Sequence, residues 1–479
     1  MIKDENLKKY FENVFRKPFD EITKTDLNQL EVIACRSQEV KDISGLEECV
    51  NVRTLDLFNN KIEDITPISN LAHVEKLNLA KNCINSIEAI QDYHHLKELD
   101  LSKNEVFPLD LKYLDDLDTL EVLNLNRASV SNVESLHKLT NLKVLHGGVR
   151  AEGFDLDVYA DLVNLEELHL PNMWLYDIGN LARLTKLRVL DLPSNLFSDG
   201  SIIAGFKDLE ILNISNNSYL KDISFVKDLP KLKTFDASFS EINDIEALRN
   251  KKELRNVWLS HCNLSDLSAL SNKPNMRKLV LSNNPIKDAQ FISEMKELVY
   301  LKLSSCSLRT IDFLKGLDKL NELNVSSNYI KDISAVRDCR GLCVLDLSNN
   351  DIKDISALQG LQNLEYIALA NNSISDLTPL SDLINLGTLD LYNNIITDLK
   401  PLSKLVNLVY LRLDHNGVSD LTPLSDLIYL NGLTLKSNYI IDLSPILNMK
   451  SLYELRLDDN PIDDISLLEK MEYYDKFSY

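Results

Sequence analysis

Glycine, proline and tryptophan are scarce in this sequence of 479 residues, which contains 13 glycines, 13 prolines and two tryptophans. This scarcity excludes a collagen-like chain and a long flexible linker. It also argues against glycine-rich loops that hold phosphates, and no G-x-G-x-x-G or P-loop motif occurs. No apolar run reaches the ~18 residues that a membrane span needs. We therefore expect neither a nucleotide site nor a membrane anchor.

Positive charge is also in deficit, because 52 lysines and arginines face 73 aspartates and glutamates, a net charge of −21. Nucleic-acid binding requires a cationic surface that displaces counterions, and anionic membranes attract basic segments. The charge therefore excludes both as expected partners. It is compatible with a basic protein partner, and equally with a simple requirement for solubility.

The chain shows no apolar segment after its charged start MIKDENLKKYFENVF, so we expect no secretory signal. Seven cysteines, an odd number, favour reduced thiols over a disulfide framework. Both features predict a cytoplasmic protein. Export by a route that the sequence does not reveal is the alternative.

A repeat dominates what is present. The residue that opens each L-x-L pair recurs every 22 residues from Phe235 to Leu455, and nearly so from Leu55 onward. The pattern L-x-x-L-x-L-x-x-N-x-I-x-D-I-x-x-L-x-x-L-x-x occurs about nineteen times, and this is the leucine-rich repeat. The L-x-L part predicts a short strand with one buried face, and stacked turns make these strands parallel. The outer half, which carries several prolines, predicts short 3₁₀ segments.

The predicted fold is an α/β repeat solenoid with one long parallel sheet on the concave face and 3₁₀ or loop segments on the convex face. We expect a helical N-terminal cap over 1–38, repeats over 39–466 and a short C-terminal cap over 467–479. Asp4 is the expected N-cap of the first helix, and Asp20 or Asp26 that of a second one. At the other end, Tyr473, Tyr474 and Phe477 would cover the last turn from a small helix.

Two polar positions of the repeat have structural explanations. The asparagine five residues after the first strand leucine is expected to point inward and bond to the backbone of adjacent turns. It occurs at Asn60, Asn82, Asn104, Asn284, Asn328, Asn350, Asn372 and Asn394, and Cys262 and Cys306 replace it. The repeated outer aspartate is expected to cap a turn rather than bind calcium.

The N-terminal text closely resembles the helical cap and first repeats of bacterial internalins. It reads DENLKKYFENVF, then FDEITKTDLNQLEVI, then KDISGLEECVNVRTLDLFNNKIEDITPISNL. The resemblance covers nearly the whole chain and implies a right-handed solenoid that recognises proteins through its concave sheet. The immunoglobulin-like domain and wall anchor of that family are not recognisable here, so surface display and host-cell invasion do not carry over with the fold.

Most residues between the paired strand leucines are aspartate or asparagine, which indicates a generic solvated face. Two clusters depart from it and are the predicted partner-binding residues, because aromatic side chains anchor protein interfaces. The first, the middle patch, comprises Phe239, Trp258, His261, Val280, Tyr300 and Lys302. The second, the C-terminal patch, comprises Tyr366, Tyr392, Tyr410, Arg412, Asp414, His415, Lys436 and Arg456, with Asp458 beside them. The alternatives are that Trp258 merely shields Val280, and that the C-terminal charges pair across strands.

The repeat is irregular between Arg127 and Trp174, where Ala128, Arg150 and Met173 replace the inward asparagine. A binding bulge and a decayed repeat are both open, and we favour decay. His146 and His169 fall on adjacent turns, but two histidines alone are weak evidence for a metal site.

No catalytic constellation is visible, since neither G-x-S-x-G nor H-E-x-x-H occurs. We expect no enzyme, no cofactor and no metal. The predicted function is a monomeric, non-enzymatic protein-interaction scaffold, internalin-like, that binds its partner on the concave face. The alternatives are a secreted or delivered virulence factor that binds a host receptor, and an inhibitory or regulatory subunit of the immunity or phosphatase-regulator type.

Overall fold

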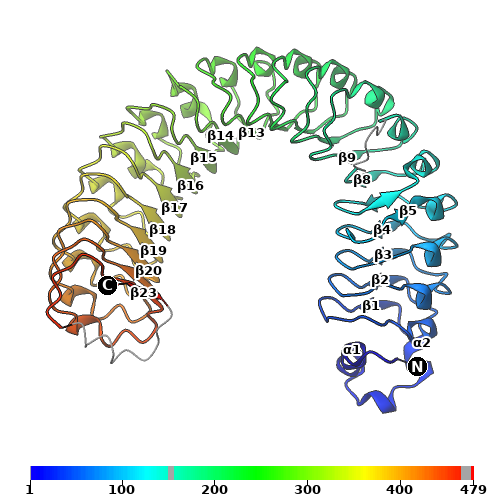
Figure 1. The fold of residues 1–479 in the computed structure, drawn as a ribbon. Helices are drawn as coiled ribbons and strands as arrows, with labels where there is room; N and C mark the ends of the chain where they lie inside the picture. Colours follow the sequence, from blue (N-terminus) through cyan, green and yellow to red (C-terminus); the bar gives the residue numbers. More distant parts are fainter. Residues whose placement is uncertain (1, 149–155, 465–475, 479) are drawn as a thin grey trace. The chain divides into compact units, whose positions relative to one another are not determined.

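The computed structural model describes residues 2–148, 156–464 and 476–478. The chain divides into two compact units, Met1–Leu232 and Lys233–Tyr479. Both consist of stacked turns, each with a three-residue strand on one side and a short 3₁₀ helix on the other (Figure 1). The predicted α/β repeat solenoid is confirmed.

The first unit contains a parallel sheet in which each strand pairs with the strand of the next turn. Its strands are β1 Val32–Ala34, β2 Thr54–Asp56, β3 Lys76–Asn78, β4 Glu98–Asp100, β6 Val122–Asn124, β8 Val144–His146, β9 Glu167–His169, β10 Val189–Asp191 and β11 Ile211–Asn213. A separate two-stranded pair joins β5 Leu109–Asp110 to β7 Val130–Ser131.

The second unit repeats this arrangement, again in parallel register and one strand per turn. Its strands are β12 Thr234–Asp236, β13 Asn256–Trp258, β14 Lys278–Val280, β15 Tyr300–Lys302, β16 Glu322–Asn324, β17 Val344–Asp346, β18 Tyr366–Ala368, β19 Thr388–Asp390, β20 Tyr410–Arg412, β21 Gly432–Thr434, β22 Glu454–Arg456 and β23 Lys476–Ser478.

The return half of each turn is a 3₁₀ helix rather than an α-helix, because 22 residues leave too little chain for more. In the first unit these are η1 Phe19–Glu21, η2 Leu46–Glu48, η3 Thr66–Ile68, η4 Glu88–Ile90, η5 Leu111–Leu114, η6 Val133–Lys138, η7 Leu156–Tyr159, η8 Gly179–Arg183, η9 Ser201–Gly205 and η10 Ser224–Asp228. In the second they are η11 Glu246–Leu248, η12 Ser268–Leu270, η13 Gln290–Glu294, η14 Asp312–Leu314, η15 Ser334–Asp338, η16 Ser356–Leu358, η17 Thr378–Leu380, η18 Lys400–Leu402, η19 Thr422–Leu424 and η20 Ser444–Ile446.

The core of each turn lies between its strand and its 3₁₀ helix. In one turn Leu345, Leu347, Ile352, Ile355 and Leu358 are all buried, and neighbouring turns bury the equivalent residues. Each such side chain contributes about 1.5–3 kcal/mol when removed from water. The aliphatic positions of the repeat therefore supply the main stabilisation of the stack.

The inward asparagine makes the predicted bonds to adjacent turns. The Asn350 side-chain nitrogen donates to the carbonyls of Val325 (3.1 Å) and Leu347 (3.0 Å), and its oxygen accepts from the Ile330 amide (3.0 Å). Where cysteine stands instead, the Cys262 thiol donates to the Ala237 carbonyl at 3.3 Å. The sequence prediction for this position is confirmed, for asparagine and for cysteine alike.

The outer aspartate caps the 3₁₀ helix, as predicted. Asp420 accepts from the Thr422 amide at 2.8 Å, just before η19. The same bond forms at Asp64, Asp177, Asp199, Asp222, Asp244, Asp266, Asp288, Asp332, Asp354, Asp376, Asp398 and Asp442. The carboxylate thus satisfies an amide that the short helix leaves without a partner.

Two short helices begin the chain. In α1 (Glu5–Phe15) Leu7 and Phe11 are buried, and Asp4 caps the helix while its second oxygen accepts from the Lys41 amide (2.9 Å). The N-cap of α2 (Lys24–Asn28) is Thr23 and not Asp20 or Asp26; Asp26 is instead the third helical residue and completes a capping box. Among the described helices, none combines the length and hydrophobicity that crossing a bilayer takes.

The predicted C-terminal helix is wrong where it can be checked. Lys476–Ser478 form the strand β23, which continues the parallel sheet beside β22. Residues 465–475 and 479, including Tyr473 and Tyr474, lie outside the described part of the chain. The boundaries at 38 and 466 stay predictions.

Candidate functional site

The last residue of each three-residue strand, which stands between the two leucines of L-x-L, lies on one side of the sheet, called here the strand face. In an ordinary turn this residue caps its own strand: Asp346 accepts from the Ser348 amide at 3.0 Å. The same bond recurs at Asp56, Asn78, Asp100, Asn124, Asn213, Asp236, Asn324 and Asp390. These residues are therefore structural, and not simply a solvated face as the sequence indicated.

The middle patch lacks this cap in three successive strands, where Trp258, Val280 and Lys302 occupy the last strand position. In the turns of Trp258 and Lys302 the bond is supplied from the preceding turn instead. The Ser260 amide donates to the Ser238 hydroxyl, and the Ser304 amide donates to the Ser282 hydroxyl, each at 3.2 Å. In these two turns the amide that follows the strand stays bonded, and the last strand position is released for a different side chain.

An aromatic pair lies beside Trp258. The rings of Phe239 and His261 stack with centroids 4.4 Å apart. Both residues have positive φ, 57° and 56°, at a position that asparagine or serine holds in most other turns. A bulky residue in this region is unusual and costs of order 1–3 kcal/mol. Phe239 is 53% exposed, so this strained ring faces solvent rather than the core.

The rest of the middle patch is only partly as predicted. The Lys302 ammonium lies 4.8 Å from the centroid of the Tyr300 ring and 3.0 Å from the Glu322 carboxylate. Trp258, Tyr300 and Lys302 are each half-buried, on strands in register. Val280 is 9% exposed and offers almost no surface, because its side chain is covered within the sheet. Val280 therefore offers a partner little surface, and its part in binding stays a prediction.

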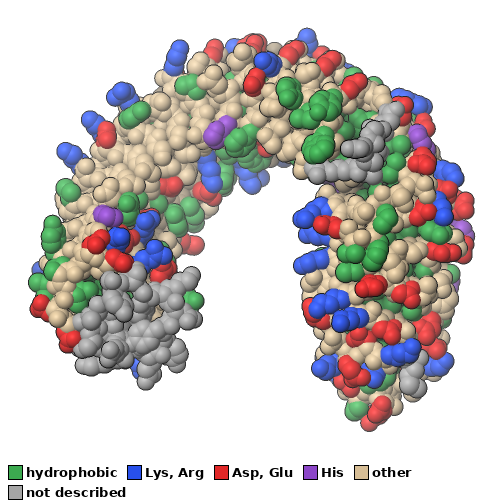
Figure 2. Space-filling view, viewed as in Figure 1, with side chains coloured by type: hydrophobic (Ala, Val, Ile, Leu, Met, Phe, Trp, Pro, Cys, Tyr) green, Lys and Arg blue, Asp and Glu red, His purple; other side chains and the backbone are tan. Residues whose placement is uncertain are grey.

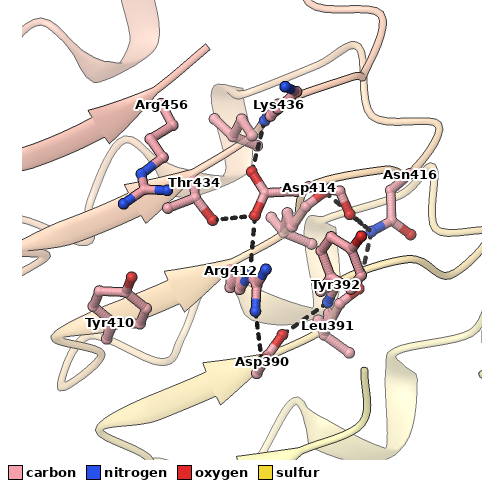
Figure 3. A network of polar contacts seen from close by, with 12 residues as sticks. Asp390, Leu391, Tyr392, Tyr410, Arg412, Asp414, Asn416, Thr434, Lys436 and Arg456 are labelled. Carbon is pink, nitrogen blue, oxygen red and sulfur yellow. Dashed lines mark hydrogen bonds and ion pairs between the residues drawn. The ribbon is translucent and has the colours of Figure 1, made fainter. Parts of the chain in front are cut away.

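The C-terminal patch is built around a buried carboxylate (Figure 3). Asp414 is 6% exposed and accepts from the Thr434 hydroxyl (2.6 Å), the Lys436 amide (2.8 Å) and the Arg412 side chain (3.0 Å). The Arg412 guanidinium also lies 4.3 Å from the centroid of the Tyr392 ring and 3.5 Å from Asp390. Arg412 is thus held in one orientation by a carboxylate below and an aromatic ring beside it.

The other predicted residues of this patch surround that network. His415 contacts Tyr392 edge-on, with centroids 5.2 Å apart, and Lys436 lies 3.7 Å from Asp459. Arg456 pairs with Glu454 at 2.6 Å. Predicted cross-strand charge pairing therefore occurs, but it leaves Arg412, Lys436 and Arg456 partly exposed.

Two tyrosines complete the C-terminal patch. Tyr366 is exposed on β18. Tyr410 is half-buried on β20, and its ring covers Gly432, where an added Cβ would come within 2.3 Å of a ring carbon. Burial raises the pKa of Tyr410. The Tyr410 ring can therefore lie against β21 only because residue 432 is glycine and has no Cβ.

The irregular segment of the first unit borders an open pocket, whose lining includes Asn126, Arg127 and Met173. The Asn195 oxygen accepts from the Met173 amide (2.9 Å), while Arg150 lies outside the described residues. The rings of His146 and His169 stack at 4.4 Å, and burial, followed by the neighbouring His169, lowers the pKa of His146. No group of three or more potential metal ligands occurs among the described residues. Decay of this repeat stays a prediction.

Sequence analysis missed a column of residues just before the strands. In the first unit it alternates in charge: Arg53, Glu75, Lys97, Glu121, Lys143, Glu166, Arg188, Glu210. Neighbours in the column form ion pairs, for example Arg53–Glu75 at 2.7 Å, Glu75–Lys97 at 2.9 Å and Glu121–Lys143 at 2.9 Å. The column becomes visible when every twenty-second residue is compared, which the search for aromatic clusters did not do.

Models of the leucine-rich repeat match the chain at several places. A model of leucine-rich repeats in two copies matches residues 252–294, 340–382 and 384–426, and a second leucine-rich-repeat model matches 50–106. Internalin C2 of Listeria monocytogenes is 34% identical over 39% of this chain and 83% of its own, with a TM-score of 0.37. The chain is an internalin-like leucine-rich-repeat protein. Its assignment rests on the repeat sequence and not on the superposition.

Other solved leucine-rich-repeat structures show the same fold. A leucine-rich-repeat protein of Leptospira interrogans is 22% identical, covering 87% of this chain and 99% of its own, with a TM-score of 0.60. The Arabidopsis receptor kinase HAESA, solved with the peptide hormone IDA and the co-receptor SERK1, is 18% identical. It covers 94% of this internalin-like chain and 78% of its own, with a TM-score of 0.63. No curated protein matches the sequence.

Proposed function

We propose that this chain is a non-enzymatic protein-interaction scaffold that binds a folded protein on the strand face of Lys233–Tyr479. One observation carries the proposal. Most turns stay regular at the inward asparagine or cysteine and at the outer aspartate, but vary at the last strand position. In the turns of Trp258 and Lys302 this residue makes no cap, and a serine of the preceding turn supplies the bond instead. Variation at a position on the strand face within an otherwise regular repeat is typical of a contact surface.

The C-terminal patch is the proposed anchor, because Arg412 is already ordered. Its side chain is held between Asp414, Asp390 and the Tyr392 ring. A side chain that is fixed before binding loses little conformational entropy on contact, and arginine and tyrosine are frequent binding hot spots. The repeat fold supports the same function, since HAESA, which shares it, is seen with a peptide and a second protein.

The test is capture of partners from a cytoplasmic lysate, the proposed location, followed by affinity measurement with the purified partner. Arg412→Ala is expected to weaken that affinity by ~30-fold, which corresponds to about 2 kcal/mol, because the mutation removes a preformed anchor. Lys353→Ala is the control, since Lys353 is exposed and lies outside both patches. Circular dichroism of both variants checks that the fold is retained.

Equal affinity of the folded Arg412→Ala and Lys353→Ala variants would reject the C-terminal patch as the anchor. A partner found only outside the cell would overturn the proposed cytoplasmic location and favour a delivered protein that binds a foreign receptor. Co-purification of an enzyme whose activity falls on binding would favour the inhibitory or regulatory subunit.

A further inference from the structure

The charge alternation of the column before the strands stops at the start of the second unit. There the column reads Lys233, Arg255, Arg277, three cations in succession. Backbone bonds place them in register, since the Arg255 amide donates to the Lys233 carbonyl (2.8 Å) and the Arg277 amide donates to the Arg255 carbonyl (2.7 Å). Like charges directly opposite each other on adjacent strands repel. The three successive cations therefore oppose folding through charge repulsion, and no other part of the column has such a run.

Two of these three cations, Arg255 and Arg277, are not neutralised within the described part of the chain. Arg255 and Arg277 are exposed and form no ion pair with any described residue. Lys278, next to Arg277, is also exposed, and its ammonium lies 6.0 Å from the centroid of the Tyr300 ring. In the first unit, by contrast, Glu75 and Glu121 alternate with basic residues and pair with them. The second unit thus presents basic groups whose counter-charge is missing.

Aromatic rings of the middle patch lie on the neighbouring strands. Trp258 ends β13, three residues after Arg255, and Tyr300 lies near both Lys278 on β14 and Lys302 on β15. Figure 2 shows lysine and arginine side chains gathered beside hydrophobic ones in the region of β13–β15. We call Arg255, Trp258, Arg277, Lys278, Tyr300 and Lys302 the cationic aromatic surface. Its sign is opposite to that of the chain as a whole, which is −21.

We propose that the cationic aromatic surface binds an acidic polypeptide segment, with carboxylates opposite Arg255, Arg277 and Lys278. Strands ~4.8 Å apart place the two guanidinium groups on neighbouring turns, where an extended segment that crosses the strands meets both. Guanidinium groups pair with carboxylates in a bidentate manner, and the rings pack against the apolar stems of the segment. The inference rests on the proposed function in one respect, that this face takes a polypeptide.

A short acidic segment suits this surface better than a nucleic acid does. The net charge of −21 repels a long polyanion along its whole length. A segment of a few residues responds mainly to charges within a Debye length, ~8 Å at physiological salt, and these are the unpaired cations. The net charge would still attract a basic protein at long range, so the possible basic partner stays a separate prediction.

The test uses the full chain and fluorescein-labelled decaglutamate, with binding followed by fluorescence anisotropy at low and high salt. We expect binding that weakens with salt. Arg255→Glu restores the alternation between Lys233 and Arg277, and we expect it to reduce affinity at least ~10-fold. Lys353→Glu makes the same charge change at an exposed position elsewhere, and should leave affinity within ~2-fold. Arg277→Gln is the second variant, in case Arg255→Glu fails to fold.

Absence of decaglutamate binding, or equal weakening by Arg255→Glu and Lys353→Glu, overturns the inference. Tighter binding of a thymidylate oligomer of the same length would assign the surface to nucleic acid instead. The result is separable from the proposed function, because decaglutamate is a direct probe and the partner assay depends on Arg412. If decaglutamate does not bind, the effect of Arg412→Ala on partner affinity can still be observed, and the reverse also holds.

Discussion

At the scale of single residues, one buried polar position is filled in two ways. Asn350 donates through its amide nitrogen to the Val325, Leu347 and Ser348 carbonyls and accepts one bond through its oxygen. Cys306 donates its thiol to the equivalent carbonyls at 3.3 and 3.4 Å, and burial raises its pKa to about 11. A protonated thiol therefore keeps the donor function, while the acceptor function of asparagine is largely lost.

Substitution of Asn350 measures the value of each function. Asn350→Ala leaves the Ile330 amide without its partner and removes one of the two side-chain donors to the Val325 and Leu347 carbonyls, which keep Asn328 and Asn372. It is expected to lower the free energy of unfolding by about 2–4 kcal/mol. Asn350→Cys keeps a donor and should cost about 1–2 kcal/mol. Urea unfolding of both variants beside the wild type checks this. Equal decreases in the free energy of unfolding for the two variants would show that a side-chain hydrogen-bond donor at this position adds nothing to stability.

At the scale of elements, the 3₁₀ helices depend on charged caps. The Thr378 and Thr422 side chains and amides lower the pKa of Asp376 and Asp420 below the ordinary 3.8, and Ser444 does so for Asp442. A carboxyl group with a lower pKa in the folded state binds protons more weakly than in the unfolded state. Its contribution to stability is present above the unfolded pKa and disappears as the pH falls through the folded pKa.

The outer caps therefore predict acid sensitivity. Because many turns carry the same cap, the urea midpoint is expected to fall steadily from about pH 5 to pH 3. Asp420→Asn keeps an oxygen acceptor that does not titrate, so this variant should show a slightly smaller decrease over the same range. Midpoints measured at several pH values provide the test, and a constant midpoint down to pH 3 would contradict it.

At the scale of the whole molecule, each turn contacts mainly its neighbours, so a defect is expected to stay local. Leu411 is buried in β20, and Leu411→Ala should cost about 2–5 kcal/mol in its own region. Amide hydrogen exchange is expected to rise in β19–β21 and to remain unchanged in β2–β4. Uniform acceleration over both regions would instead indicate one cooperative unit.

The repeat positions were predictable because every turn presents the same environment. The inward asparagine, the outer aspartate and the L-x-L strand each recur at one spacing, and their hydrogen bonds are repeated at Asn350, Asp420 and their counterparts. For the same reason the sequence could place Trp258 and Tyr300 on one face, which the strand register confirms, while binding by the patches stays a prediction. Departures from the period were not predictable in this way, as the burial of Val280 demonstrates.

The sequence by itself determined the stack of turns, because the pattern that forms one turn also forms its neighbours. Only the tertiary structure decided which strand-face groups are partnered. Asp414 is buried by Arg412 and Thr434, while Arg255 and Arg277 are left without a counter-charge among the described residues. The physical reason is that such contacts depend on how side chains of different turns pack, as for Asp414 and Thr434, which are 20 residues apart in the sequence.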